Sequence, residues 1–175
     1  MCCAVRAGPW GPRASVSDAS FEDVYRRELQ TMVALATSLT GSREAGVDLA
    51  HEAMLRAYRA WEKVGQLDRP GAWIRRVLIN LTIDHARRRQ RERRALTRLQ
   101  PAPPVEPGDP ESARFWAAVR ALPERQRAAV ALHYLDDRPV EEIAEILDVT
   151  AGTVKTSLFK ARQSLARTLR AEEVS

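Results

Sequence analysis

The stretch Arg138–Leu165, RPVEEIAEILDVTAGTVKTSLFKARQSL, has the pattern of two helices joined by a tight turn. Pro139 suits a helix start, and Thr150 suits the N-cap of the second helix. Asp148 and Val149 fall in the turn between them. The residues of the first helix that are expected to point inward are Val140, Ile143, Ala144 and Leu147. A small residue such as Ala144 lets two helices cross closely, so this stretch predicts a helix-turn-helix unit.

The second helix of this unit has two different faces. Val154, Leu158 and Leu165 fall on one face and are expected to be buried. On the other face, lysines could reach phosphates or guanine edges in a DNA major groove, and an exposed aromatic ring could contact a thymine methyl. The alternative is that Phe159 belongs to the core and the lysines are merely solvated. The predicted DNA-reading set comprises Gly152, Thr153, Lys155, Thr156, Phe159, Lys160 and Gln163.

A second long helix is predicted in LDRPGAWIRRVLINLTIDHARRRQRERR, Leu67–Arg94, with Pro70 at its start. Its apolar stripe consists of Trp73, Ile74, Val77, Leu78 and Leu81, whereas Arg75, Arg76, Asn80 and Asp84 fall nearer the polar side. Six arginines occupy the eight positions 87–94, too many for Glu92 to neutralise. A polyanion is therefore the expected counterpart. The alternative is a solvated helix end.

Two helices are predicted before this one. The first follows a capping box formed by Ser20 and Asp23 and ends at Gly41. The second runs from about Glu44 to Lys63 and should bury Val47, Ala50, Met54, Tyr58 and Trp61. Its other face carries Asp48, Glu52, Leu55, Arg56 and Arg59. That face could be solvated with ordinary ion pairs, but an apolar residue among the charges hints at a partner.

Composition limits the function classes. The chain has 175 residues and a net charge of +5, and all but three of its 28 basic residues are arginine, which suits contacts with phosphates and base edges. Cys2 and Cys3 are adjacent, so they cannot build a disulfide framework or a cysteine metal site. No apolar run approaches the ~20 residues of a membrane span, and no signal peptide is evident. We therefore expect a cytoplasmic protein without membrane insertion.

Changes in composition predict an all-α protein made of two small helical domains. Residues 1–19 read as an unstructured tail, and residues 20–95 read as a bundle of three or four helices. Residues 96–112 read as a linker, since five prolines lie between Gln100 and Ser112. Residues 113–171 form the domain with the helix-turn-helix, and residues 172–175 form a short tail.

Three segments of the chain resemble segments of the extracytoplasmic-function sigma factors of bacterial RNA polymerase and follow one another in the same order. The resemblance is to the minimal two-domain form of this family, and in particular to the actinobacterial sigma-E-like group. VDLAHEAMLRAYRAW (47–61) resembles the polymerase-binding helix, and AWIRRVLINLTIDHARRR (72–89) resembles the promoter-melting helix of sigma region 2. LPERQRAAVALHYLDDRPVEEIAEILDVTAGTVKTSLFKAR (122–162) resembles sigma region 4, which reads the upstream promoter element. His51 stands where the family commonly has Gln, and Asp148 stands where its turn often has Gly.

The resemblance implies a role for each set of residues. The face of Asp48, Glu52, Leu55, Arg56 and Arg59 would dock on core RNA polymerase, whose β′ and β subunits are the expected partners together with promoter DNA. The −35 element would be read by the set defined above on the helix-turn-helix unit. An anti-sigma factor is a further partner that the family allows. The −10 element would be bound by Leu67, Asp68, Arg69, Trp73, Arg75, Arg76, Asn80, Arg87, Arg88 and Arg89.

Two other classes of function fit the sequence less well. A metalloprotease would need a second histidine where Leu55 stands after His51 and Glu52, while His85 and His133 lack partners at ligand spacing. We therefore expect no enzymatic activity, cofactor, metal or small-molecule substrate. The stronger alternative is a free-standing helix-turn-helix regulator, which would bind operator DNA by itself, usually as a symmetric dimer.

Overall fold

The computed structural model describes residues 20–95 and 109–173, and all eight regular elements in these ranges are helices. The predicted all-α fold class is confirmed. Residues 1–19 and most of the predicted linker lie outside the described residues. The helices are α1 (Phe21–Thr40), α2 (Arg43–Arg59), α3 (Trp61–Val64), α4 (Pro70–Ala95), α5 (Pro110–Arg120), α6 (Glu124–Tyr134), α7 (Val140–Leu147) and α8 (Ala151–Glu173).

The first group consists of α1 to α4, with α1, α2 and α4 packed against one another. Both predicted ends of α1 are confirmed. Ser20 and Asp23 form a capping box, and Gly41 ends the helix in a left-handed conformation with φ of 72°. Gly46 lies where α2 approaches α1, since a Cβ atom there would be 2.7 Å from the backbone nitrogen of Thr37. The crossing of these two helices therefore requires a residue without a side chain.

The second predicted helix is interrupted. It was expected to run to about Lys63, but α2 ends at Arg59, and α3 begins after Ala60, whose φ of −108° is not helical. The prediction that Tyr58 is buried is also wrong, because 62% of this residue is exposed. Its ring instead packs on Phe21, with ring centroids 5.1 Å apart. Tyr58 therefore lies at the edge of an aromatic cluster and contributes to the surface of α2.

The second group consists of α5 to α8 and contains the predicted helix-turn-helix. Pro139 precedes α7, which ends at Asp148 in a left-handed conformation with φ of 56°. The Thr150 hydroxyl caps α8 by accepting a hydrogen bond from the backbone N–H of Thr153 at 3.2 Å. Val154, Leu158 and Leu165 are buried, as predicted. Helix α5 begins at Pro110, within the segment predicted as a linker, and α8 continues to Glu173.

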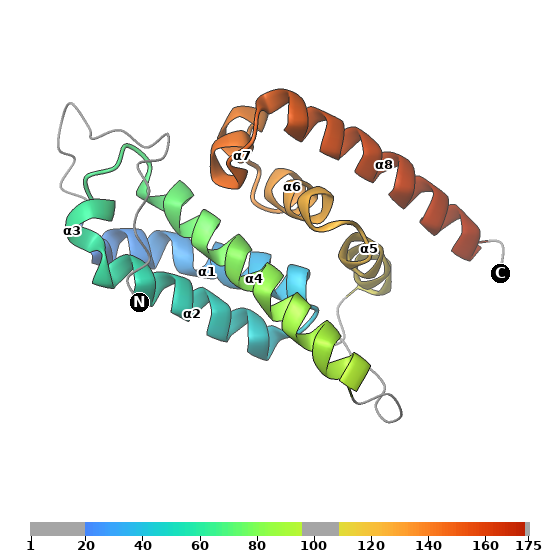
Figure 1. Cartoon of the computed structure of the whole chain (residues 1–175), viewed down its shortest axis with the longest axis horizontal. Helices are drawn as coiled ribbons and strands as arrows, with labels where there is room; N and C mark the ends of the chain where they lie inside the picture. Colours follow the sequence, from blue (N-terminus) through green and yellow to red (C-terminus); the bar gives the residue numbers. More distant parts are fainter. Residues whose placement is uncertain (1–19, 96–108, 174–175) are drawn as a thin grey trace.

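The two groups lie side by side, with α8 on the outer side of the second group (Figure 1). Helix α4 contacts α7, and α1 contacts α5 and α6. Buried apolar side chains of both groups belong to one contiguous cluster. Within the described ranges, none of the helices has the length and apolar character needed to cross a bilayer.

Candidate nucleic-acid interface

The first half of α8 exposes the residues predicted to read DNA. Thr153 is half-buried, and 59% of Phe159 is exposed. The Thr156 hydroxyl donates a hydrogen bond to the Gly152 carbonyl at 2.9 Å, so its oxygen keeps acceptor capacity toward solvent. The alternative that Phe159 belongs to the core is wrong. The members of the set that lie exposed on the surface are Gly152, Lys155, Thr156, Phe159, Lys160 and Gln163.

A groove runs beside this face, between the start of α6 and the start of α8. From α6 it is lined by Glu124, Arg125 and Gln126, after Pro123, and from α8 by Thr153, Thr156 and Lys160 among others. The side-chain oxygen of Gln126 is buried with no hydrogen-bond partner. The sequence alone did not predict that Arg125 and Gln126 lie beside the DNA-reading face. The pattern of α6 marks its start at Pro123, but only the packing of α6 on α8 brings that start to the DNA-reading face.

The charged face of α2 is open to solvent. Asp48, Arg56 and Arg59 are exposed, and Leu55 is 41% exposed among them. The Arg56 guanidinium donates a hydrogen bond to the Glu52 carboxylate at 2.8 Å, one turn away. This face therefore combines an apolar contact point with charges of both signs.

Residues predicted to bind the −10 element lie on α4 and on the loop before it. Trp73 is half-buried and packs on the core, whereas Asn80 and Arg88 are exposed. Asp68 and Arg69 of this loop and residues 70–72 at the start of α4 line a cavity together with Arg138 and Glu142 of the second group. The cavity beside this loop is therefore built from both halves of the protein.

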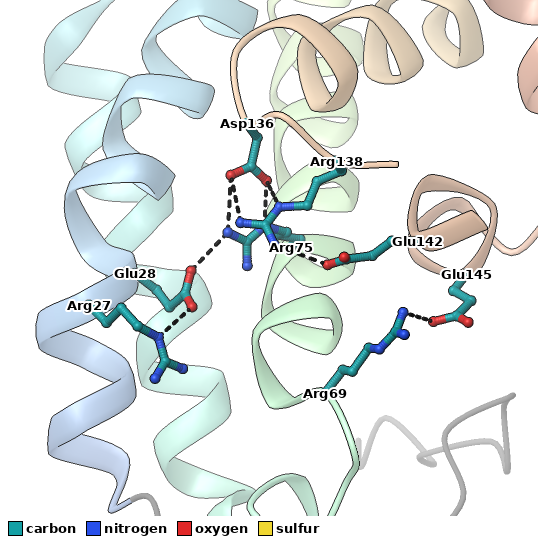
Figure 2. A network of polar contacts seen from close by, with 8 residues as sticks. All are labelled: Arg27, Glu28, Arg69, Arg75, Asp136, Arg138, Glu142 and Glu145. Atoms are coloured by element: carbon teal, nitrogen blue, oxygen red, sulfur yellow. Dashed lines mark hydrogen bonds and ion pairs between the residues drawn. The ribbon is translucent and has the colours of Figure 1, made fainter. Parts of the chain in front are cut away.

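Arg75 is the clearest departure from the sequence-based expectation. It was placed nearer the polar side of α4, but only 1% of it is exposed. Its guanidinium donates to both oxygens of Asp136, with Nη2 to Oδ1 at 3.0 Å, and Nη2 also donates to Glu28 at 2.8 Å (Figure 2). The reason is tertiary, because the second group covers this side of α4.

Other arginines of the predicted −10 set are also tied to carboxylates of the second group. Arg69 lies 3.2 Å from Glu145 on α7, and Arg76 lies 2.8 Å from Asp148 at the end of α7. The guanidinium of Arg87 donates two hydrogen bonds to Glu124, at 2.9 and 2.7 Å. The polar side of α4 thus faces acidic side chains of α6, α7 and the turns beside them.

Burial and neighbouring charges shift several pKa values in this region. Burial alone would raise the pKa of Glu28, but the charge of Arg75 and hydrogen bonds from Arg27 and Arg75 hold it below its ordinary value. Burial alone would likewise lower the pKa of Arg75. Its hydrogen bonds with Asp136 and Glu28 and the negative charges of these two carboxylates, with Asp136 contributing more, raise the pKa above its ordinary value. These contacts therefore favour the charged forms of Glu28 and Arg75.

His85, on the same helix, has a pKa below its ordinary value of 6.5, first because of burial and then because of the charges of Arg88 and Arg89. Within residues 20–95 and 109–173, no cluster of three or more histidine, cysteine, aspartate or glutamate residues could hold a metal ion.

Two family models match the sequence. The model of Sigma-70 region 2 matches residues 24–92, and the model of Sigma-70 region 4 matches residues 112–165. The two matches follow the division into two helical groups and together cover more than two thirds of the chain.

Curated relatives show the same resemblance across both halves. The chain is 32% identical over 158 residues to the ECF RNA polymerase sigma factor SigE of Mycolicibacterium smegmatis, covering 83% of this chain and 60% of that protein. It is 28% identical to the ECF RNA polymerase sigma factor SigW of Bacillus subtilis, covering 87% of this chain and 88% of the relative. It is also 28% identical to the RNA polymerase sigma-E factor of Streptomyces coelicolor, with 88% of each chain covered.

Two solved structures have the same fold. The sigma factor RpoE of Bartonella quintana, in complex with the anti-sigma factor NepR, matches with a TM-score of 0.67 at 24% identity, covering 86% of this chain and 96% of that one. CnrH in complex with the cytosolic domain of CnrY matches with a TM-score of 0.66 at 20% identity, covering 86% and 88%.

Proposed function

The chain belongs to the sigma-70 family as an RNA polymerase sigma factor of the extracytoplasmic-function type. We propose that one half of the protein recognises the −10 promoter element and the other half recognises the −35 element. Region 2 corresponds to α1–α4, and region 4 corresponds to α5–α8. The observation that carries the proposal is the exposed polar face of α8, because it is presented by a capped helix-turn-helix whose opposite face is buried.

Region 4 reads the −35 element with this face of α8. Lys155 and Lys160 supply positive charge for phosphates or guanine edges, and Phe159 supplies an apolar surface for a thymine methyl. Arg125, beside the same groove, adds a further cation for the DNA backbone. These contacts fix the position of region 4 on the upstream promoter.

Region 2 binds and helps to open the −10 element. The loop Leu67–Ala72 and Asn80 hold an extruded base, with Trp73 packed beneath the loop, while the arginines of α4 follow the phosphates. Extruding a base costs a few kcal/mol of unstacking, which contacts with the single strand must offset. The density of arginines along α4 supports this role.

The exposed face of α2 docks on core RNA polymerase. Its charges of both signs and the exposed Leu55 suit a protein partner better than they suit DNA. The β′ subunit is the proposed main contact, and the β subunit is a second one. RNA synthesis stays with the polymerase, so this protein contributes specificity and no catalysis, and it acts in the cytoplasm.

An anti-sigma factor is a further proposed partner. Two solved structures with the same fold are complexes, one of the sigma factor RpoE with the anti-sigma factor NepR and one of CnrH with the cytosolic domain of CnrY. That likeness of fold supports a comparable form of control here.

Transcription in vitro tests the proposal. Fragmented genomic DNA is transcribed by core RNA polymerase with and without this protein, and transcript starts are sequenced. We expect new starts that share a pair of upstream motifs. Discrete DNA sites protected by the protein alone, without new starts, would instead favour a free-standing regulator.

A further inference from the structure

Tyr134 and Arg162 form a polar pair on the surface of region 4, outside the predicted DNA-reading set. Tyr134 is the last residue of α6, and Arg162 lies on α8. The Arg162 Nε donates a hydrogen bond to the Tyr134 hydroxyl at 2.7 Å, and the guanidinium carbon lies 5.9 Å from the centre of the tyrosine ring. Both residues are exposed, Tyr134 to 51%. The pair therefore presents polar atoms to a partner outside the chain.

The hydrogen bond between the two side chains leaves several donors unused. The tyrosine oxygen accepts from Arg162, so the hydroxyl can still donate its own hydrogen. Arg162 uses only Nε in this bond, so both of its terminal nitrogens can donate to another group. Among the described residues, no carboxylate forms an ion pair with Arg162. A phosphate matches these donors, because it is negatively charged and has several acceptor oxygens.

Neighbouring contacts hold the tyrosine in place. The ring of His133 packs edge-on against the ring of Tyr134, with centroids 4.8 Å apart. The Nδ1 atom of His133 in turn lies 3.2 Å from the carbonyl oxygen of Arg138. Side chains that are already ordered lose little conformational entropy when they bind. The pair is therefore suited to bind a ligand without rearrangement.

Arg162 lies in line with a residue proposed to read DNA. It follows Lys155 by seven residues, which is almost two helical turns, so the two lie on nearly the same line along α8 and about 10.5 Å apart. The major groove is about 12 Å wide. When Lys155 is inside the groove, Arg162 therefore reaches the edge of the groove, where the backbone phosphates lie.

The charge of α8 favours DNA as the partner. Residues 151–171 include five lysines and arginines and no aspartate or glutamate. A surface with one sign of charge attracts a polyanion more strongly than it attracts a protein surface with charges of both signs. Phosphates of the DNA backbone are therefore the natural ligands of this side of the helix.

Arg167 has the same charge as Arg162 but a different setting. Its guanidinium bonds back to its own helix, with Nε 3.4 Å from the Gln163 carbonyl and Nη2 3.5 Å from the Ser164 hydroxyl. Five residues separate it from Arg162, so it points about 140° away around the axis of α8. Arg167 is therefore a matched control for the charge of Arg162.

We propose that Tyr134 and Arg162 bind one backbone phosphate at the edge of the −35 element. The tyrosine hydroxyl and the terminal nitrogens of Arg162 donate to the phosphate oxygens. The contact fixes the position of α8 in the groove and carries no sequence information itself. The proposal rests on the role proposed above for α8 in reading this element.

The test removes the donors of the pair one residue at a time. Arg162→Ala removes the guanidinium, whereas Tyr134→Phe removes only the hydroxyl and keeps the ring that packs on His133. Arg167→Ala is the control, because it removes the same charge from the same helix. Circular dichroism and urea unfolding check the folding and stability of each variant, and fluorescence anisotropy measures its association with core polymerase.

DNA binding is measured over a range of salt concentrations on two probes. The complex of the full chain with core polymerase binds a promoter duplex identified by transcription in vitro. The full chain alone binds a random-sequence duplex of about 30 base pairs at low salt, because a phosphate contact does not depend on sequence.

Arg162→Ala should weaken promoter binding by about fivefold, and the slope of log affinity against log salt concentration should become shallower by about 1, because one phosphate contact is lost. Its slope on the random-sequence duplex should become shallower as well. Tyr134→Phe should weaken promoter binding by about twofold with an unchanged slope, because the hydroxyl carries no charge. Arg167→Ala should match the wild-type protein on both probes.

A second set of promoter duplexes locates the phosphate. Single phosphates in and beside the −35 element are replaced, one at a time, by uncharged methylphosphonates. One replacement should weaken binding by the wild-type protein and by Arg167→Ala but not by Arg162→Ala, because that variant already lacks the contact.

Equal affinities and salt slopes for Arg162→Ala and Arg167→Ala would overturn the proposal. Lower stability of Arg162→Ala with unchanged DNA binding would also overturn it, since the pair would then only hold α6 against α8. Weaker association of Arg162→Ala with core polymerase, again with unchanged DNA binding, would replace the phosphate by a protein partner.

Failure of the phosphate contact and failure of the sigma function can be told apart. If the wild-type protein directs transcription while Arg162→Ala behaves like the control on both probes, the contact is wrong and the function stands. If no transcription depends on the protein, the function is wrong, and the random-sequence duplex decides on the contact. A shallower slope in Arg162→Ala alone would support a phosphate contact there, and equal slopes would overturn it.

Discussion

At the scale of single residues, the lysines of α8 give the most direct test of DNA reading. Lys155→Ala and Lys160→Ala should each weaken promoter binding by about 1–3 kcal/mol if the lysine contacts a base, because alanine removes the charged hydrogen-bond donor of that contact. Filter binding by the complex with core polymerase measures the effect, and binding to core polymerase itself should be unchanged. Arg167→Ala, farther along α8, is the control and should have little effect. Unchanged promoter use in both lysine variants would contradict the groove assignment.

His85 provides a reporter for the basic end of α4. Burial lowers its pKa below 6.5, and so do the charges of Arg88 and Arg89. Phosphates bound to these arginines would cancel the contribution of their charges, so the pKa of His85 should rise when DNA binds, while burial continues to oppose protonation.

An NMR titration of the His85 ring, with and without a dT oligomer, measures this rise. His51, on α2, provides a second histidine signal in the same spectra. An identical pKa with saturating DNA would show that phosphates do not approach Arg88 and Arg89.

Prediction from sequence succeeded for residues whose role depends on local pattern. Ser20, Thr150 and the inward face of α8 follow from capping and helical periodicity, and the structure confirms them. Arg75 could not be predicted, because its partners Asp136 and Glu28 are distant in the chain. The sequence pattern predicts that an arginine at the edge of an apolar stripe is exposed, because the pattern does not show which carboxylate from another element will pair with it.

At the scale of elements, the crossing of α1 and α2 depends on Gly46. A Cβ atom at this position would be 2.3 Å from the Thr37 hydroxyl and 2.9 Å from the Thr37 Cα. Gly46→Ala should therefore destabilise region 2 by about 1–3 kcal/mol through overpacking, although alanine favours a helix by up to about 1 kcal/mol. Urea unfolding measures the change.

Gly152→Ala is the matched control, since a Cβ atom there meets only the Thr150 hydroxyl, at 3.8 Å. That variant should be neutral or slightly stabilising. A stabilised Gly46→Ala protein would show that α1 and α2 can move apart at little cost.

The exposed face of α2 can be tested as a unit. Changing Asp48 and Glu52 together to asparagine and glutamine should weaken association with core polymerase by at least about tenfold, because it removes negative charge from a docking surface, and it also weakens the pairing of Glu52 with Arg56. Binding of region 4 to upstream DNA should be unaffected. Intact association with core polymerase, measured by fluorescence anisotropy, would mean that the docking face lies elsewhere.

The helices themselves were predictable because proline, glycine and capping residues mark their ends. The break between α2 and α3 was not, since the apolar pattern continues through Ala60 and Trp61 without a proline or glycine. Trp61 packs on Phe21 of α1, with ring centroids 5.3 Å apart. This contact joins residues far apart in the chain, so the local sequence around Ala60 could not predict it.

At the scale of the whole molecule, the sequence predicts two helical domains but not how they meet. Arg75 and Asp136 are 61 positions apart, and each is unremarkable in its own segment. The contact between the two groups depends on apolar packing, on a buried network around Arg75, and on more exposed pairs such as Arg87 with Glu124. These contributions respond differently to salt, so their relative weight can be measured.

Raising the ionic strength from about 0.1 M to about 1 M shortens the screening length from about 10 Å to about 3 Å, which weakens exposed ion pairs far more than buried ones. Small-angle scattering of the wild-type protein should therefore show a nearly constant radius of gyration, because Arg75 and Asp136 are shielded from solvent. In Asp136→Asn, the buried pair loses its charge and the contact between the groups depends on the exposed pairs, so high salt should expand the protein. Asp137→Asn, one residue away and exposed, is the control and should behave as wild type. Expansion of the wild-type protein by salt alone would instead show that the exposed pairs hold the two halves together.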